Sequence, residues 1–266
     1  MHPLLASMLV LAATWDAWRW YAARVSATPE EVVSLALAVA LLGGLGAARM
    51  SRPSAPRPLP LMPIAVLLAA YAASYGVLPP IVRAAIAIAA TLFCCYLAAF
   101  RERPPIAFWG LVALALPVLP SLQFTLGYPM RVVSAALAVA LLQSQGVLVA
   151  RQGTFLVWRD AMVQFDAPCS GVNMLWAGLV LTLAGCVLFR LRAPSVLAAV
   201  ALSVVLAIAC NALRASSLFY GEVGLIPLGP AWGHDAIGIA AFMVSAGITF
   251  WFLARLRDRE MVPWTS

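Results

Sequence analysis

The sequence predicts an all-α fold: a polytopic integral membrane helix bundle with about eight transmembrane helices. Of the 266 residues, 64% are hydrophobic and 10% are charged, which is more apolar surface than a water-soluble domain can bury. The apolar residues also fall into repeated blocks of about 20, the length that crosses a hydrocarbon core as an α-helix. A membrane β-barrel is not expected, because its strands would alternate apolar and polar residues instead.

The apolar blocks give the expected helices, at 4–22, 32–48, 60–77, 81–99, 106–124, 131–149, 170–189, 195–218 and 234–255. We interpret the first as a spanning helix and not as a removable signal peptide, because no basic residue precedes its apolar core. One of 106–124 and 131–149 is expected not to span, since an even number of crossings must separate the basic loops on either side. Pro117 and Pro120 interrupt the former, and the purely apolar part of the latter is only about 15 residues long. An interfacial or re-entrant segment there would leave both termini inside.

Arginine placement predicts the orientation of these helices. All 17 basic residues are arginines, and they cluster in short segments between the apolar blocks. Such clusters mark cytoplasmic loops, so we expect 49–57, 101–103, 190–192 and the tail at 255–259 to lie inside. The arginines that give the net charge of +7 therefore indicate how the helices are oriented in the membrane, and a nucleic-acid partner is not expected.

Two polar features of the sequence are assigned structural roles. Residues 151–168 are too polar to span, and TFLVW and AMVQF flank Arg159 and Asp160, so a small extracytoplasmic hairpin or loop is expected before residue 169. Asp16 and Arg19 lie among Trp and Tyr residues and are interpreted as an anchor at the membrane interface.

Three reactive side chains are expected at the outer face. If 190–192 is cytoplasmic, Cys169 lies at the outer end of the helix at 170–189, and Arg214 lies near the outer end of the next helix. His234 then opens the last helix from outside. The four other cysteines lie inside apolar runs, where a free Cys usually packs as a small hydrophobe: Cys94, Cys95, Cys186 and Cys210. No CxxC or His-rich cluster is present, so neither a metal nor another cofactor is expected.

These three groups predict nucleophilic acyl transfer. The Cys169 thiol would attack as a thiolate, which a helix N-terminus and a nearby cation or imidazole favour. His234 would act as general base and then as acid, since imidazoles titrate near neutral pH. Arg214, an ionised group in an apolar helix, would stabilise the tetrahedral intermediate or hold a substrate carboxylate.

Further residues next to Cys169 and Arg214 are expected to support this chemistry. The backbone N–H groups of Ser170, Gly171 and Val172 open a helix and could receive a developing oxyanion. Gly171 would also let a substrate backbone approach closely. Asn211 precedes Arg214 by three positions and faces the same way on its helix.

Each of these assignments has a structural alternative. Cys169 could be inert, Arg214 could extend to the interface as many terminal arginines do, and His234, next to Asp235, could cap its helix. A transporter in which Arg214 binds an anion, or a membrane protein of polysaccharide assembly without a catalytic cysteine, is the competing function. We see no internal repeat of the kind that transporters show. The sequence has one histidine besides His234, which is His2, so the three reactive residue types at one face favour the enzyme.

Four segments in this order resemble the exosortase/archaeosortase family. They are "GVLVARQGTFLV", "APCSGVNML" around Cys169, "NALRASSL" around Arg214 and "WGHDAIGIAAF" around His234, and the resemblance covers about residues 110–255. It implies a polytopic cysteine transpeptidase, similar in chemistry but not in fold to Gram-positive sortases. Such enzymes cleave C-terminal sorting signals of exported proteins at the outer face of the membrane.

The resemblance also implies roles, partners and a location. Cys169 would be the nucleophile, Arg214 the orienting or transition-state cation and His234 the proton shuttle. The substrates would end in a short motif, a transmembrane helix and an Arg-rich tail, of the PEP-CTERM type in bacteria, and the acceptor would be envelope- or exopolysaccharide-linked. Val172 and Asn173 depart from the basic residue that many members carry there, which leaves the substrate motif open.

The expected organisation follows from the same resemblance. N-terminal transmembrane helices would occupy 1–105, an exosortase-like catalytic core 106–258 and a cytoplasmic tail 259–266. The chain would lie among the lipids of a bacterial or archaeal cytoplasmic membrane, with its active site facing the extracytoplasmic side.

Overall fold

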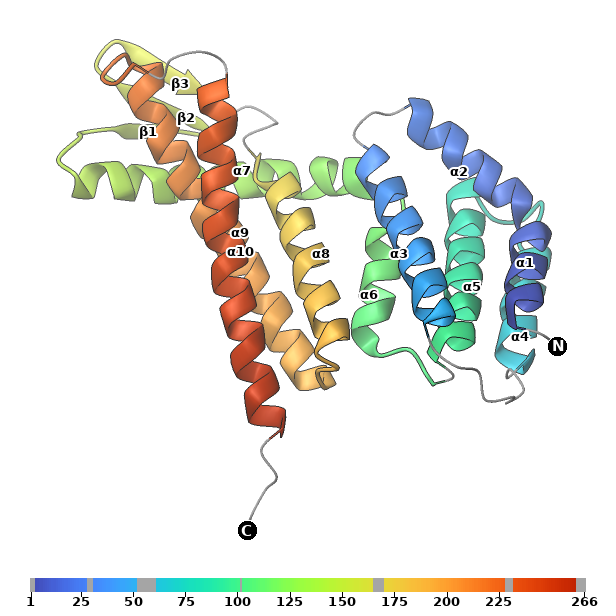
Figure 1. Ribbon diagram of the computed structural model, residues 1–266. Coiled ribbons are helices and arrows are strands. Elements are labelled where there is room, and N and C mark those ends of the chain that lie inside the picture. Colours follow the sequence, from blue (N-terminus) through green and yellow to red (C-terminus); the bar gives the residue numbers. More distant parts are fainter. Residues whose placement is uncertain are drawn as a thin grey trace. The chain divides into compact units, whose positions relative to one another are not determined.

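Helices form nearly all of the regular structure of the chain, as the apolar blocks predict. The computed structural model describes residues 3–27, 31–51, 61–100, 102–164, 170–227 and 232–261. Within them the chain divides into two units, residues 1–120 and 121–266, shown in blue to green and in green to red in Figure 1.

The first unit is a helical bundle organised around one central helix. Its helices are α1 (Pro3–Ala13), α2 (Trp15–Ala27), α3 (Val32–Met50), α4 (Leu61–Ala73), α5 (Pro80–Phe100) and α6 (Ile106–Leu114). All five others pack on α5, whose buried side includes Ala84, Ala87 and Ala90. These small side chains let the neighbouring helices approach closely. Close packing favours helix association in a membrane, where the lipid is as apolar as the helix surface and the hydrophobic effect gives no drive.

The first expected span, 4–22, is wrong as a single helix. The chain forms α1 and α2 with a break at Thr14, whose hydroxyl donates a hydrogen bond to the Val10 carbonyl at 2.8 Å. A threonine that bonds back to the carbonyl four residues earlier bends a helix, because the hydroxyl competes for that acceptor.

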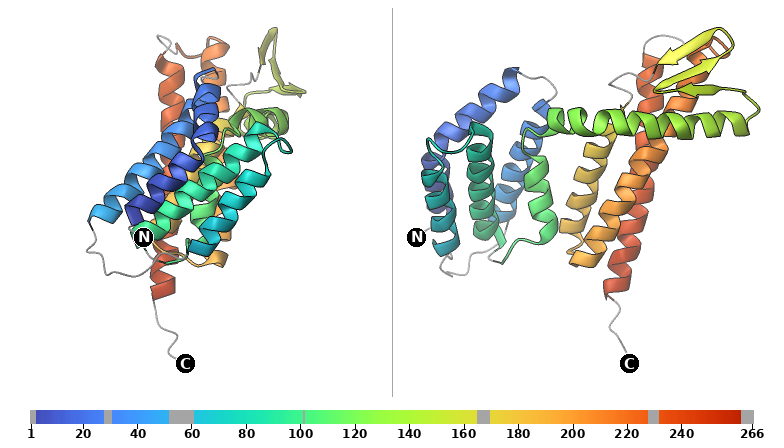
Figure 2. Two further views of the ribbon diagram at one scale, coloured as in Figure 1. Left: turned by 90° about the vertical axis from the view of Figure 1, so that its right-hand side faces the viewer. Right: turned by 180° about the vertical axis from the view of Figure 1, so that it is seen from behind.

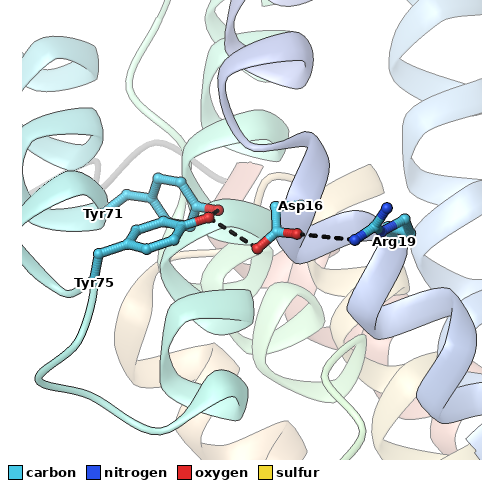
Figure 3. Close-up of polar contacts among 4 residues, drawn as sticks. All are labelled: Asp16, Arg19, Tyr71 and Tyr75. Atoms are coloured by element: carbon cyan, nitrogen blue, oxygen red, sulfur yellow. Dashed lines mark hydrogen bonds and ion pairs between the residues drawn. The ribbon is translucent and has the colours of Figure 1, made fainter.

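Asp16 and Arg19, which the sequence predicts to form an interfacial anchor, contact each other in the first unit, and two tyrosines extend the group. The Arg19 guanidinium lies 3.6 Å from one Asp16 oxygen, and Tyr75 donates a hydrogen bond of 2.9 Å to the other (Figure 3). The Tyr71 hydroxyl lies 3.4 Å from that of Tyr75, and the Arg83 guanidinium lies 4.6 Å from the Tyr75 ring centre. Pairing through aromatic hydroxyls fits an interfacial position, where rings meet both apolar and polar surroundings.

The second unit combines three long helices, a helix that crosses them and a small sheet. Its elements are α7 (Leu119–Ser144, in this unit from Ser121), β1 (Ala150–Gln152), β2 (Phe155–Trp158), β3 (Ala161–Gln164), α8 (Val172–Leu188), α9 (Ala193–Glu222) and α10 (Trp232–Met261). Helices α8, α9 and α10 pack on one another along their lengths. Figures 1 and 2 show α7 lying across these three helices and not alongside them.

Neither of the two doubtful blocks has its expected bounds. The block at 106–124 is split, because α6 ends at Leu114 before Pro117, whose ring cannot continue the helical hydrogen bonds. The remainder joins the block at 131–149 to form α7, a single helix with Pro129 inside it. The transverse course of α7 is the arrangement expected of an interfacial segment.

The all-α membrane fold is supported, and the count of eight spans is not confirmed. Among the described residues, α3, α5, α7, α9 and α10 are long and apolar enough to cross a membrane, and α4 and α8 are shorter apolar helices. Because α7 meets this criterion by length and composition but lies across its neighbours, helix length does not decide the number of crossings.

The predicted hairpin is confirmed and extended by one strand. β2 and β3 pair antiparallel around Arg159 and Asp160, and β1 adds on the other side of β2 to give the order β1-β2-β3. Leu156 at the centre of the sheet is fully buried and packs with Leu142 of α7 and Phe219 of α9. The sheet is therefore fixed to the helices that surround the expected reactive residues.

The ends of the long helices that carry the predicted cytoplasmic arginines meet. Glu260 near the end of α10 accepts hydrogen bonds from the Arg192 backbone N–H at 3.1 Å and from the Ser195 hydroxyl at 2.5 Å. Leu253 of α10 lies so close to Gly185 of α8 that a Cβ there would be 2.5 Å from the leucine side chain. The loop at 190–192 and the tail at 255–259 therefore lie at the same end of the unit, as predicted.

Candidate active site

The structure gathers most of the predicted site residues around one cavity at the opposite end of the second unit. Cys169 itself, in the segment 165–169, lies outside the described residues. The cavity has a volume of about 520 Å³ and is lined by residues of α8, α9 and α10 and the turn before α8: Gly171, Asn173, Met174, Ala177, Asn211, Arg214, His234, Asp235, Gly238, Ile239 and Phe242. The predicted residues Gly171, Asn211, Arg214 and His234 are thus brought together, and Ser170 lies next to them in the chain.

The turn that follows Cys169 depends on a glycine. Gly171 has φ +80°, in the left-handed region that a residue with a side chain rarely adopts. A Cβ at this position would lie 2.8 Å from Cγ of Asn211, so α9 leaves no room for one. Asn211 is 1% exposed and donates a hydrogen bond of 3.0 Å to Ser134 of α7. These contacts join the turn, α9 and α7 into one support.

A glutamine that sequence reasoning missed connects α7 to the same turn. The Ser170 hydroxyl donates to Gln123 Oε1 at 3.0 Å, and Gln123 Nε2 donates to Asn173 Oδ1 at 3.1 Å. Ser170 is 1% exposed, so both the residue after Cys169 and the first turn of α8 are tied to α7. The Val172 N–H lies 3.3 Å from Ser170 Oγ and donates to it, so this predicted oxyanion donor is engaged in the ground state.

Arg214 is held against α10 by close packing. A Cβ on Gly238 would lie 3.2 Å from Arg214 Nε, so the glycine leaves space for the arginine side chain. The ion pairs found between described residues do not include Arg214, although Asp235 lines the same cavity. The guanidinium can therefore offer its donors to a bound group, in the planar fork that suits a carboxylate or an oxyanion.

His234 is paired with an acidic residue. Its Nε2 lies 3.3 Å from Glu222 Oε1, at the end of α9, and both side chains are a little under half exposed. α10 begins at Trp232, so His234 lies inside the helix and not at the capping position that the alternative interpretation requires. A carboxylate on one ring nitrogen orients the imidazole and leaves Nδ1 for proton exchange.

The site residues that sequence reasoning missed differ in whether the sequence carries a signal for them. Glu222 is the one acidic residue in 219–233, and Gln123 is a polar residue in an apolar block, so both carried a compositional signal. Ser134 carried none, because small hydroxyl residues are common in membrane helices for packing alone. Cys94, Cys186 and Cys210 are buried within helices, consistent with the prediction that they pack as hydrophobes.

A comparison with protein families shows a match over nearly the whole chain. The model of the family described as transmembrane exosortase matches residues 1–251. Neither the comparison with curated proteins nor that with solved structures gave a match.

Proposed function

The chain belongs to the transmembrane exosortase family, and from this premise we propose that it is a membrane-embedded cysteine transpeptidase that cleaves C-terminal sorting signals of exported proteins at the outer face. The observation that carries the proposal is the cavity in which Arg214 and His234 meet the Gly171 turn, two residues after Cys169. A thiol at that turn would have an imidazole, a guanidinium and backbone N–H groups available for one reaction.

The proposed reaction proceeds through a thioester. His234 takes the Cys169 proton, and the sulfur attacks the carbonyl carbon of the scissile peptide bond. Arg214, with the Ser170 and Gly171 N–H groups in the turn before α8, stabilises the oxyanion of the tetrahedral intermediate. The C–N bond then breaks as His234 returns the proton to the leaving amine. A nucleophile of an envelope- or exopolysaccharide-linked acceptor attacks the thioester, its proton passes to His234, and the thiolate leaves and is reprotonated.

The direct test is to follow processing of a reporter in cells. The reporter is an exported protein fused to a C-terminal segment from the same genome that ends in a short motif, an apolar helix and an Arg cluster. Co-expression with the chain should release the reporter from its helix, with a new C-terminus found by mass spectrometry on the N-terminal side of the helix. An unprocessed reporter with every such C-terminal segment of the genome would count against the proposal.

The proposed orientation has its own test, because the side of the active site follows from the arginine loops. We expect a membrane-impermeant maleimide to label Cys169 in intact spheroplasts. The variant Cys169→Ala is the control for background from the four other cysteines. Labelling that appears only in inverted vesicles would place the cavity on the cytoplasmic side and would contradict the assigned topology.

Substitution of Gly171 by alanine should reduce reporter processing about tenfold or more. The new Cβ would meet Asn211 and adopt an unfavourable φ, and a penalty of about 1.4 kcal/mol at the site already gives this factor. Gly146→Ala is the matched control, because Gly146 has φ +84° and a Cβ added there would have no atom within 4 Å. Equal effects of the two variants would show that backbone strain alone, and not the contact with Asn211, is responsible.

Glu222→Gln should reduce processing about tenfold, because the neutral amide no longer stabilises the imidazolium that forms at His234, and a loss of about 1.4 kcal/mol already gives this factor. Glu222→Asp should recover part of this loss because it keeps the carboxylate. Asp258→Asn, near the other end of α10, is the control, because Asp258 contacts Arg257 whereas Glu222 contacts His234. A Glu222→Gln variant as active as Asp258→Asn would remove Glu222 from the proposed mechanism.

A further inference from the structure

The strand β3 lies at one edge of the three-stranded sheet and ends a few residues before Cys169 in the sequence. In the order β1-β2-β3, β2 is the only strand among the described residues that pairs with β3. The backbone hydrogen bonds found between described residues outside helices and strands include none from 161–164. Gln164, the last residue of β3, precedes Cys169 by five positions.

The register shows which backbone groups face away from β2. Trp158 and Ala161 flank the two-residue turn, so they form a hydrogen-bonded pair, and hydrogen-bonded and non-hydrogen-bonded pairs alternate along an antiparallel ladder. The N–H and C=O groups of Ala161 and Val163 therefore point toward β2. Those of Met162 and Gln164 point toward the free edge.

The edge strand β3 is held in place by the inner face of the sheet, which packs on the helices. Val163 of β3 and Trp158 of β2 pack against the buried cluster that includes Leu156 and Phe219. Met162 and Gln164 are exposed, so their side chains lie on the outer face of the sheet. The strand is thus anchored by its inward residues and presents two residues with outward backbone donors and acceptors.

We propose that this edge of β3 binds the extended peptide segment of the substrate next to the scissile bond as an added fourth strand; the inference rests on the proposed function. Strand addition uses main-chain hydrogen bonds for affinity and therefore accepts varied sequences. Five residues of extended chain span at most about 17 Å, so Cys169 lies within that distance of Gln164. The substrate residues that follow a strand parallel to β3 can cover the same distance. The continuity of β3 with the Cys169 segment favours a substrate peptide over a second copy of the chain.

Proline substitutions distinguish this edge from the rest of the sheet. Met162→Pro removes the outward N–H and leaves the hydrogen bonds to β2, and we expect it to reduce reporter processing about tenfold, the effect of losing about 1.4 kcal/mol of substrate binding. Arg151→Pro is the matched control. Arg151 pairs with Leu156 next to the Gln152 and Phe155 pair that flanks the other turn, so its N–H faces the free edge of β1. That variant should process the reporter within about twofold of the unsubstituted chain.

Disulfide crosslinking tests the same contact without enzymatic turnover. Its readout does not depend on a proline substitution that could disturb folding. In a full-length Cys169→Ala chain carrying Gln164→Cys, mild oxidation should crosslink the reporter through single cysteines placed along the segment before its helix. Efficiency should rise and fall with a period of two residues, as side chains of a strand alternate. Arg151→Cys in place of Gln164→Cys should give no such pattern.

The outcomes separate this inference from the proposed function. Cys169-dependent processing that is unchanged by Met162→Pro, or crosslinking without a two-residue period, would overturn strand addition and leave the transpeptidase proposal standing. Crosslinks between two copies of the chain through Gln164→Cys, with none to the reporter, would overturn it in favour of edge-to-edge pairing. Because crosslinking uses the inactive Cys169→Ala chain, it decides the inference even if no processing is found.

Discussion

Replacing Cys169 by alanine should abolish processing of the reporter, with a loss of at least about a thousandfold. Alanine has no nucleophile, so no thioester can form, and the remaining groups can only polarise the substrate toward water. Processing is measured by mass spectrometry at matched levels of the chain in the membrane. The large effect is expected because, in the proposed mechanism, the imidazole and the guanidinium act on a step that the thiol must begin.

Cys95→Ala is the matched control for the loss of a thiol. Cys95 lies in α5 and is only partly buried, and it has no part in the proposed chemistry. We expect this variant to process the reporter like the unsubstituted chain. Processing that survives Cys169→Ala would remove the nucleophile from the mechanism and would favour a function in which this cysteine only packs.

Replacing Arg214 by alanine should reduce processing about a hundredfold or more, the usual effect of removing one preorganised donor to an oxyanion. Arg214→Lys should recover little of this loss, because lysine keeps the charge but lacks the planar fork of donors, whereas the missing Cβ at Gly238 leaves space shaped for the arginine side chain. Comparing the dependence on reporter level separates the two roles proposed for Arg214. Stabilisation of the intermediate lowers the maximal rate, whereas a carboxylate clamp mainly raises the amount of reporter needed.

Arg255→Ala is the matched control for the loss of a helical arginine in the same unit. Arg255 lies toward the other end of α10, with its guanidinium 5.6 Å from the Trp251 ring centre. The chain should retain its processing activity when this charge is removed. An equal loss in Arg214→Ala and Arg255→Ala would indicate a general effect of net charge on insertion or orientation.

The convergence of the site residues could be predicted because it depends on chain direction. Consecutive long apolar blocks must run up and down, so the start of α8, the end of α9 and the start of α10 lie at one end. That reasoning placed Gly171, Asn211, Arg214 and His234 together before any contact was known. The pairing of β2 and β3 followed equally from local alternation around Arg159 and Asp160.

The contacts that support the site could not be predicted in the same way. Gln123 meets Ser170 from 47 positions away, and Asn211 meets Ser134 from 77, and no periodicity links such partners. The break at Thr14 and the fusion of two blocks into α7 also escaped prediction. A hydropathy profile measures apolar length, whereas these features depend on one hydroxyl and on where prolines fall relative to a turn.

Two sets of contacts hold the C-terminal part of α10: Glu260 contacts Arg192 and Ser195, and Leu253 packs on Gly185. These contacts fix α8, α9 and α10 to one another at the end away from the cavity. His234 lies 19 residues before Leu253, which is about 29 Å along a helix. A tilt of α10 by about 5° around that fixed end therefore moves the imidazole by about 2.5 Å at constant helix geometry. A small rotation of α10 about that fixed end would therefore change the distance between His234 and the residues of α8 and α9 that line the same cavity.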